Sequence, residues 1–150
     1  VQFLTSGTDA RKEMIVKILQ ETIPVKGIYE RSDSNARSQE GLQNSTGCLF
    51  GETPPSSLYI KENGILFNAP IVEGQKSGYF LDQRENRKKL AAYTKGKKVL
   101  DCFSYTGGFS INAKQSGASE VWSVDSSALA TEAIKNNYSI PLPPICNNAY

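Results

Sequence analysis

The apolar positions near the start of the chain follow a helical period. These positions are Met14, Ile15, Ile18 and Leu19. Their spacing predicts a helix that begins at Thr8 or Asp9 and ends before Pro24. A short apolar run then predicts a strand over residues 25–30, and the polar stretch 32–57 predicts an irregular segment.

A hairpin and a helix are predicted in the middle of the chain. Residues 58–70 flank the dipeptide Asn63-Gly64, which favours a two-residue turn because both residues tolerate positive φ. Asp82 has the capping-box spacing to Glu85, and this predicts a helix over about residues 83–92 with Asp82 as its cap. We therefore expect a small mixed α+β domain over residues 1–72 and a second domain from residue 73.

The second domain, residues 73–137, shows strand, helix and strand in succession. Apolar runs at 99–103 and 121–124 predict two strands, and a helix between them starts at Gly108 and stops at Gly117. A further helix starts at Ser126, and one of its sides carries Leu129, Ala130, Ala133, Ile134 and Asn137. This order predicts a parallel βαβ unit, so the fold class is α/β with an incomplete Rossmann-like core. The proline-rich tail, residues 138–150, suits neither a helix interior nor a central strand.

Each predicted strand of the βαβ unit carries an aspartate near its end. Asp125 follows Asp101 by 24 positions, so both carboxylates are expected at the carboxyl edge of the sheet, where nucleotides bind. The turn after Asp101 lacks the first two glycines of the G-x-G-x-x-G fingerprint, which favours a ligand without phosphates, such as S-adenosylmethionine. Asp125 would accept hydrogen bonds from the ribose hydroxyls of this ligand, and Asp101 would help to hold the ammonium of its amino-acid tail. Gly107 and Gly108 would leave room for the ribose and the amino-acid tail. The alternative is an ordinary βαβ unit in which the glycines only tighten the turn.

Composition narrows the class of protein. The chain has 150 residues, of which 39% are hydrophobic and 21% charged, which is typical of a globular protein. No apolar run approaches the roughly 18–20 residues of a membrane helix, so we expect no membrane partner. The three cysteines (Cys48, Cys102 and Cys146) show no metal-binding pattern, and histidine is absent, which argues against a metal site or a histidine triad. Free cysteines suit a cytoplasmic location.

A basic cluster lies around the start of the βαβ unit, although the net charge is only +2. Its members are Arg84, Arg87, Lys88, Lys89, Lys95, Lys97 and Lys98. Such a cluster can contact nucleic-acid phosphates. The alternative is a solvated helix face followed by a lysine-rich turn.

Two segments, Glu73 to Arg87 and Val99 to Phe109, resemble class I S-adenosylmethionine-dependent methyltransferases that modify large-subunit ribosomal RNA. Gly27 to Asp33 and Gly47 to Glu52 resemble the small domain that precedes the core in this family, so the resemblance covers about residues 1–137. Its best-known branch makes 5-methylcytosine and a related branch 7-methylguanine. The resemblance implies S-adenosylmethionine as cofactor and 23S-type ribosomal RNA as partner. In the 5-methylcytosine branch a cysteine thiolate attacks the base from a later motif, so the catalytic residues are expected beyond Tyr150.

The resemblance also implies that the loop starting at Gly74 lies over the cofactor. Tyr79 and Phe80 could wall the ligand by stacking, or Phe80 and Leu81 could staple the small domain to the core. The expected cofactor-binding residues are Asp101, Phe103, Ser104, Tyr105, Thr106, Gly107, Gly108, Asp125, Ser126, Gln75, Lys76, Phe80 and Arg84.

Cys102 is expected to be a buried packing residue and not a nucleophile. The strand 99–103 should lack a neighbour on one side, which predicts either a homo-oligomer through the open sheet edge or coverage of that edge by the proline-rich tail. Two functions remain open: the cofactor-binding portion of a ribosomal RNA methyltransferase, or a non-catalytic fragment or RNA-binding module.

Overall fold

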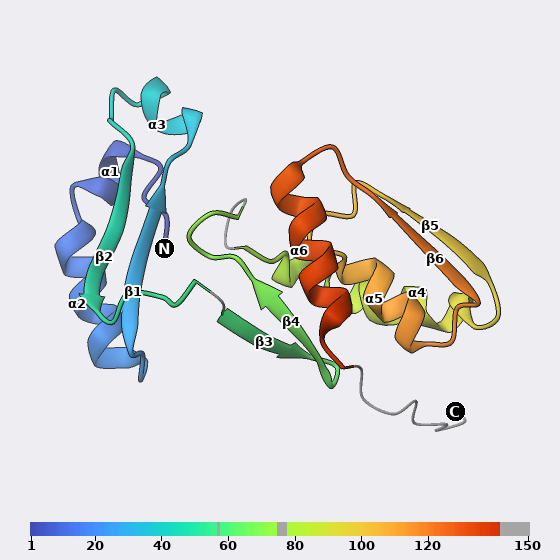
Figure 1. Ribbon diagram of the computed structural model, residues 1–150. Helices are drawn as coiled ribbons and strands as arrows, with labels where there is room; N and C mark the ends of the chain where they lie inside the picture. Colours follow the sequence, from blue (N-terminus) through green and yellow to red (C-terminus); the bar gives the residue numbers. More distant parts are fainter. Residues whose placement is uncertain (57, 75–77, 142–150) are drawn as a thin grey trace. The chain divides into compact units, whose positions relative to one another are not determined.

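The computed structural model describes residues 1–56, 58–74 and 78–141, and divides the chain into two compact units, Val1–Ser56 and Ser57–Tyr150 (Figure 1). The α/β class with a parallel βαβ core is confirmed. No helix in these described ranges is long and apolar enough to cross a membrane.

The first unit is a two-stranded antiparallel sheet with helices. Its elements are α1 (Ser6–Asp9), α2 (Lys12–Thr22), β1 (Gly27–Ser32), α3 (Asn35–Gln39) and β2 (Ser45–Gly51). The expected helix is thus split into α1 and α2, and the segment 32–57, expected to be irregular, contains α3 and β2. Ser34 caps α3 by accepting a hydrogen bond from the backbone of Ala36, a local signal typical of helix starts.

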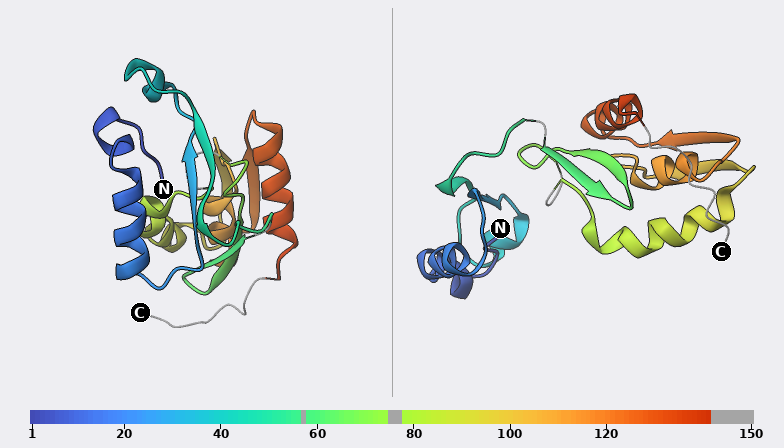
Figure 2. Two further views of the ribbon diagram at one scale, coloured as in Figure 1. Left: turned by 90° about the vertical axis from the view of Figure 1, so that its left-hand side faces the viewer. Right: turned by 90° about the horizontal axis from the view of Figure 1, so that it is seen from below.

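The core of the first unit lies between α2 and the β1–β2 sheet, and Figure 2 shows α2 running along these strands. Phe3, Val16 and Ile28 are buried, and Ile15, Leu19 and Leu49 pack against them. Met14 and Ile18, expected on the same face as Ile15 and Leu19, are about half exposed. The strands approach closely at one end, where a Cβ on Gly27 would lie 2.1 Å from the backbone oxygen of Glu52.

The second unit begins with a hairpin of β3 (Leu58–Glu62) and β4 (Ile65–Ala69). Asn63 and Gly64 have φ values of 50° and 84°, so the predicted turn with two positive φ angles is confirmed. The hairpin packs against the rest of the second unit, since Ile65 and Phe67 share a core cluster with Tyr79 and Ile111. The compact units therefore part at residue 56, ahead of the boundary expected at residue 72.

The βαβ unit follows. Its elements are η1 (Leu81–Gln83), α4 (Arg84–Thr94), β5 (Lys98–Cys102), α5 (Gly108–Gln115), β6 (Glu120–Val124) and α6 (Ala128–Ser139). β5 and β6 are parallel, as predicted, and α5 connects them (Figure 1). Asp82 does not cap α4: the N-cap is Gln83, and the Asp82 carboxylate accepts from the Gln83 side chain. Residues 142–150, most of the expected tail, lie outside the described ranges, and α6 continues to Ser139.

One face of the β5–β6 pair is apolar and open within the described chain. Leu100 pairs with Trp122 and Cys102 with Val124 across the two strands. All four side chains are exposed, Leu100 at 63% and Trp122 at 61%. The expectation that Cys102 is a buried packing residue is therefore wrong, because the alternation of the strand turns its side chain to the uncovered face.

Candidate functional site

The carboxyl ends of β5 and β6 bring the predicted site residues together. The register pairs Cys102 with Val124, so the loop from Phe103 to Gly107 and the carboxylate of Asp125 leave the sheet at the same edge. The Ser104 backbone N–H and hydroxyl both donate to the Val124 carbonyl oxygen, each over 3.1 Å. These contacts join the loop to the end of the neighbouring strand.

The loop has an unusual backbone. Phe103, Tyr105 and Gly107 have φ values of 60°, 49° and 79°, so every second residue is left-handed. The left-handed conformation is uncommon for bulky L-residues and costs of order 1 kcal/mol or more at each. A hydrogen bond of 2.8 Å from the Gly107 N–H to the Ser104 carbonyl oxygen closes the turn, and the Phe103 side chain is 92% exposed. Strain of this kind concentrates at functional sites.

Asp125 holds this loop from the end of β6. Its Oδ2 accepts the backbone N–H of Tyr105 over 2.9 Å, and its Oδ1 accepts the backbone N–H of Ser127, the N-cap of α6, over 2.9 Å. Asp125 is half-buried, and each carboxylate oxygen has a second lone pair. The carboxylate can therefore fasten the loop and still accept a ligand hydroxyl. Ser126, between these two anchors, is exposed.

Asp101 is engaged toward the protein interior. Its Oδ2 accepts the Ser110 N–H over 3.0 Å and the Ser110 hydroxyl over 2.6 Å, in the first turn of α5. The Ser123 hydroxyl of β6 donates to the Ser110 Oγ over 2.6 Å. This carboxylate thus anchors the start of α5, a structural task that the spacing alone did not indicate. A contact of Asp101 with a ligand ammonium stays a prediction.

Thr106, Gly107 and Gly108 form the buried floor of the site. A Cβ on Gly108 would lie 3.2 Å from Cδ of Arg87, and one on Gly107 would lie 3.4 Å from the side chain of Ile134. Both glycines therefore serve close packing, and Gly107 also has the positive φ of the turn. Thr106 is 2% exposed, so its side chain does not face solvent.

Tyr105 of the loop forms an aromatic pair with Phe80, the residue before η1. The rings of Phe80 and Tyr105 meet edge to face, with centroids 5.3 Å apart. A Cβ on Gly74 would lie 2.3 Å from the Pro70 backbone oxygen and 2.8 Å from the Tyr105 hydroxyl oxygen, so only glycine fits here. Arg84, at the start of α4, is exposed. Gln75 and Lys76 lie outside the described residues.

Tyr79 and Leu81 do not occupy their expected positions. Tyr79 is buried against Phe67, with ring centroids 5.2 Å apart, so it belongs to the core and does not wall a ligand. Burial raises the pKa of its phenol above the ordinary value. Leu81 is 67% exposed, so it is not buried in the core of the second unit.

Asn137, on the buried side of α6, joins three parts of the second unit. Its Oδ1 accepts the backbone N–H of Asn68 over 2.6 Å, and its Nδ2 donates to the Asn68 carbonyl oxygen over 3.3 Å. Nδ2 also donates to the Thr106 carbonyl oxygen over 2.9 Å. One amide therefore pairs with β4 as a neighbouring strand would, and holds the loop. The polar residue within the apolar side of the helix was the only sequence signal for this role.

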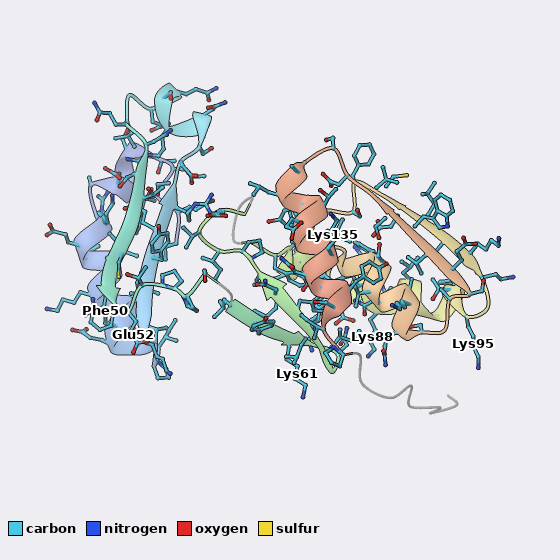
Figure 3. The ribbon with its side chains drawn as sticks, in the orientation of Figure 1. Phe50, Glu52, Lys61, Lys88, Lys95 and Lys135 are labelled. Carbon is cyan, nitrogen blue, oxygen red and sulfur yellow. The ribbon has the colours of Figure 1, made fainter. Side chains whose placement is uncertain are left out.

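The basic cluster is reduced by burial and pairing. Arg87 is 2% exposed and bonded to Glu62, so the expectation that it contacts phosphates is wrong. Lys98 pairs with Glu120 over 2.9 Å. Of the other members, Lys88 and Lys95 are labelled in Figure 3 and are exposed, as are Arg84, Lys89 and Lys97.

Comparison with known proteins adds the family. The family model described as S-adenosylmethionine-dependent methyltransferase matches residues 37–140. The chain belongs to this family. Ribosomal RNA large subunit methyltransferase I from Aliivibrio fischeri is 48% identical over 139 residues, 93% of this chain. The chain spans 35% of that relative's length.

Solved structures agree. A protein from Streptococcus mutans, described as a SAM-dependent methyltransferase, has a TM-score of 0.73 at 32% identity, covering 91% of this chain and 36% of its own. A methyltransferase complexed with SAH has a TM-score of 0.66 at 33% identity, covering 87% of this chain and 33% of its own. The cofactor of the family is S-adenosylmethionine.

Proposed function

We propose that the second unit forms the cofactor-binding part of a methyltransferase, with the ligand at the carboxyl edge of β5 and β6. The observation that carries this is the strained loop from Phe103 to Gly107, fastened by the half-buried Asp125. The chemistry of the site suits the ligand, because Asp125 has lone pairs that can accept hydrogen bonds from ribose hydroxyls. Phe80 and Tyr105 offer ring surface beside it. S-adenosylmethionine, when bound, supplies a methyl group on a sulfonium.

For the intact protein we propose large-subunit ribosomal RNA of the 23S type as substrate, with cytosine C5 as the methylated atom. The name of the Aliivibrio fischeri relative, at 48% identity, supports the ribosomal RNA. The cytosine assignment rests on the sequence resemblance. The groups that hold the base and attack it are expected outside residues 1–150, and such a substrate places the protein in the cytoplasm.

The binding experiment compares this chain with an intact parent protein. Calorimetry with S-adenosylmethionine should show binding by the parent, and binding weaker by orders of magnitude or none by residues 1–150, because buried contacts of about 1–3 kcal/mol each are missing. In the parent, Asp125→Ala should lower the affinity for the cofactor. The matched control is Glu132→Gln, on the exposed side of α6, which should leave it unchanged.

Methyl transfer completes the test. The parent should methylate unmodified ribosomal RNA and residues 1–150 should not. Robust turnover by residues 1–150 refutes the placement of the chemistry outside them. A parent that retains full affinity after Asp125→Ala refutes the ribose role. RNA binding by residues 1–150 with no cofactor binding by the parent favours the alternative, a non-catalytic RNA-binding module.

We also infer that the isolated chain associates through the β5–β6 pair. β5 pairs with β6 alone among the described strands, and Leu100 and Trp122 expose apolar surface beside its open edge. Open edges and large apolar patches recruit further chains. Sedimentation should show a dimer or larger species, and a monomer at high micromolar concentration contradicts this inference.

A further inference from the structure

A buried ion pair connects the β3–β4 hairpin to α4. Nε of Arg87 donates to Oε1 of Glu62 over 2.7 Å, and Nη2 of Arg87 donates to Oε2 over 2.7 Å. Glu62 is 5% exposed and Arg87 is 2% exposed. The Tyr79 hydroxyl donates to Oε1 of Glu62 over 3.2 Å, and the guanidinium lies 4.4 Å from the centre of the Tyr79 ring. The two-pronged geometry and the ring fix the guanidinium plane in one orientation.

The fixed guanidinium reaches two parts of the proposed cofactor site. Its Nη2 also donates to the Phe80 carbonyl oxygen over 2.9 Å. Its Cδ lies against Gly108, the first residue of α5, so closely that a Cβ there would be 3.2 Å away. The Phe80 ring in turn meets the Tyr105 ring, and the Tyr105 N–H is held by Asp125. A continuous set of contacts therefore runs from the hairpin to the strained loop.

We propose that Glu62 and Arg87 are positioning residues that hold Phe80 against Tyr105 and so set the affinity of the loop for the cofactor. The proposal rests on the proposed function, since it assumes that the cofactor binds at this loop. A buried ion pair adds little net stability compared with apolar residues of similar volume, whereas its fork fixes orientation. The β3–β4 hairpin, which lies outside the βαβ unit, then becomes part of the binding apparatus.

The first measurement tests the packing of Phe80 against Tyr105 in the absence of ligand. Arg87→Lys keeps the positive charge but removes the fork that bonds Glu62 and Phe80 together. NMR spectra should show the ring proton signals of Phe80 and Tyr105 moving toward solvent-averaged values, because edge-to-face rings shift each other's resonances. The control is Glu120→Gln, which breaks the exposed pair with Lys98 and should leave both rings unchanged. Unchanged Phe80 and Tyr105 signals in Arg87→Lys overturn the proposal.

The second measurement reads affinity for S-adenosylhomocysteine in the intact parent. Arg87→Lys should raise the dissociation constant about tenfold, equivalent to about 1.4 kcal/mol. Ile60→Val, which packs against the core of the same hairpin and pairs with Phe67 instead of Glu62 across the two strands, should lower stability and leave the constant unchanged. An equal loss of affinity in both variants shows that stability alone matters and overturns the proposal. Should Arg87→Lys fail to fold, Tyr79→Phe, which removes the hydroxyl that bonds Glu62 and keeps the ring, should give a smaller change in the same direction. The absence of that change overturns the proposal.

The two proposals fail in different ways. If the wild-type parent does not bind S-adenosylhomocysteine, the proposed function fails. The ligand-free spectra then still decide whether Arg87 positions Phe80 against Tyr105.

Discussion

Replacing Asn137 by alanine should destabilise the second unit strongly for a single side chain. The residue is 1% exposed and makes three hydrogen bonds, two with the backbone of Asn68 and one with the Thr106 carbonyl oxygen. At roughly 1 kcal/mol for each bond, the expected loss in the free energy of unfolding is about 3 kcal/mol. The higher helix propensity of alanine stabilises α6 by about 0.5 kcal/mol, so the net decrease in the free energy of unfolding is about 2–3 kcal/mol.

Asn136→Ala is the matched control. It makes the same chemical change one position earlier on α6, at an exposed side chain, and therefore carries the same gain in helix propensity without the three bonds. Amide hydrogen exchange is the suitable assay because the chain has two compact units, and a single unfolding curve would mix them. The Asn68 amide, which donates to Asn137, should exchange at least tenfold faster in Asn137→Ala than in Asn136→Ala. Equal exchange rates of the Asn68 amide in the two variants would refute a stabilising role for the Asn137 hydrogen bonds.

Three further outcomes are expected. Burial disfavours the charged form of Glu30, but hydrogen bonds from Ser32, Lys12 and Ser45 outweigh it and lower the pKa of the carboxyl. Glu30 therefore stabilises the first unit above the ordinary carboxyl pKa, and this contribution disappears as the pH falls below about 4. Amide exchange in the first unit should become faster over this pH range, and Glu30→Gln should weaken that pH dependence. Gly27→Ala should disrupt the β1–β2 sheet, since its Cβ would overlap the Glu52 backbone oxygen, whereas Gly7→Ala, with 3.8 Å of clearance, should be tolerated in circular dichroism and thermal melts. Leu100→Lys should reduce the binding of an apolar dye to the open β5–β6 face, and undiminished binding would place the exposed surface elsewhere.

The elements of the βαβ unit were predictable because each has a local signal. Gly117, with φ of 86°, ends α5 as expected, and the Asn63-Gly64 turn defines the hairpin. β2 was missed because its residues are only partly buried, so its apolar alternation is weak amid polar neighbours. Its pairing with β1 is a long-range contact that no local pattern encodes.

The candidate site was predictable in position but less so in the task of each residue. The spacing of Asp101 and Asp125 placed both carboxylates at one sheet edge, yet their partners, Ser110 and the Tyr105 backbone, depend on how the loop folds back. The sequence analysis assigned Arg87 to a basic cluster, because no local pattern indicates that Arg87 forms an ion pair with Glu62, 25 positions earlier. The exposure of Cys102 was missed because a strand apolar on both faces normally implies cover on both sides.

The ion pair of Glu62 and Arg87 restricts which fragments of this chain can be expressed as folded proteins. A fragment that starts at residue 73, between the hairpin and α4, would keep Arg87 and lose its carboxylate. The same cut removes Ile65 and Phe67, the hairpin members of the core cluster that Tyr79 and Ile111 complete. Asn137 would lose the Asn68 backbone in the same cut. A fragment that begins at residue 57 keeps both connections, so the hairpin must be expressed with the helices that follow it.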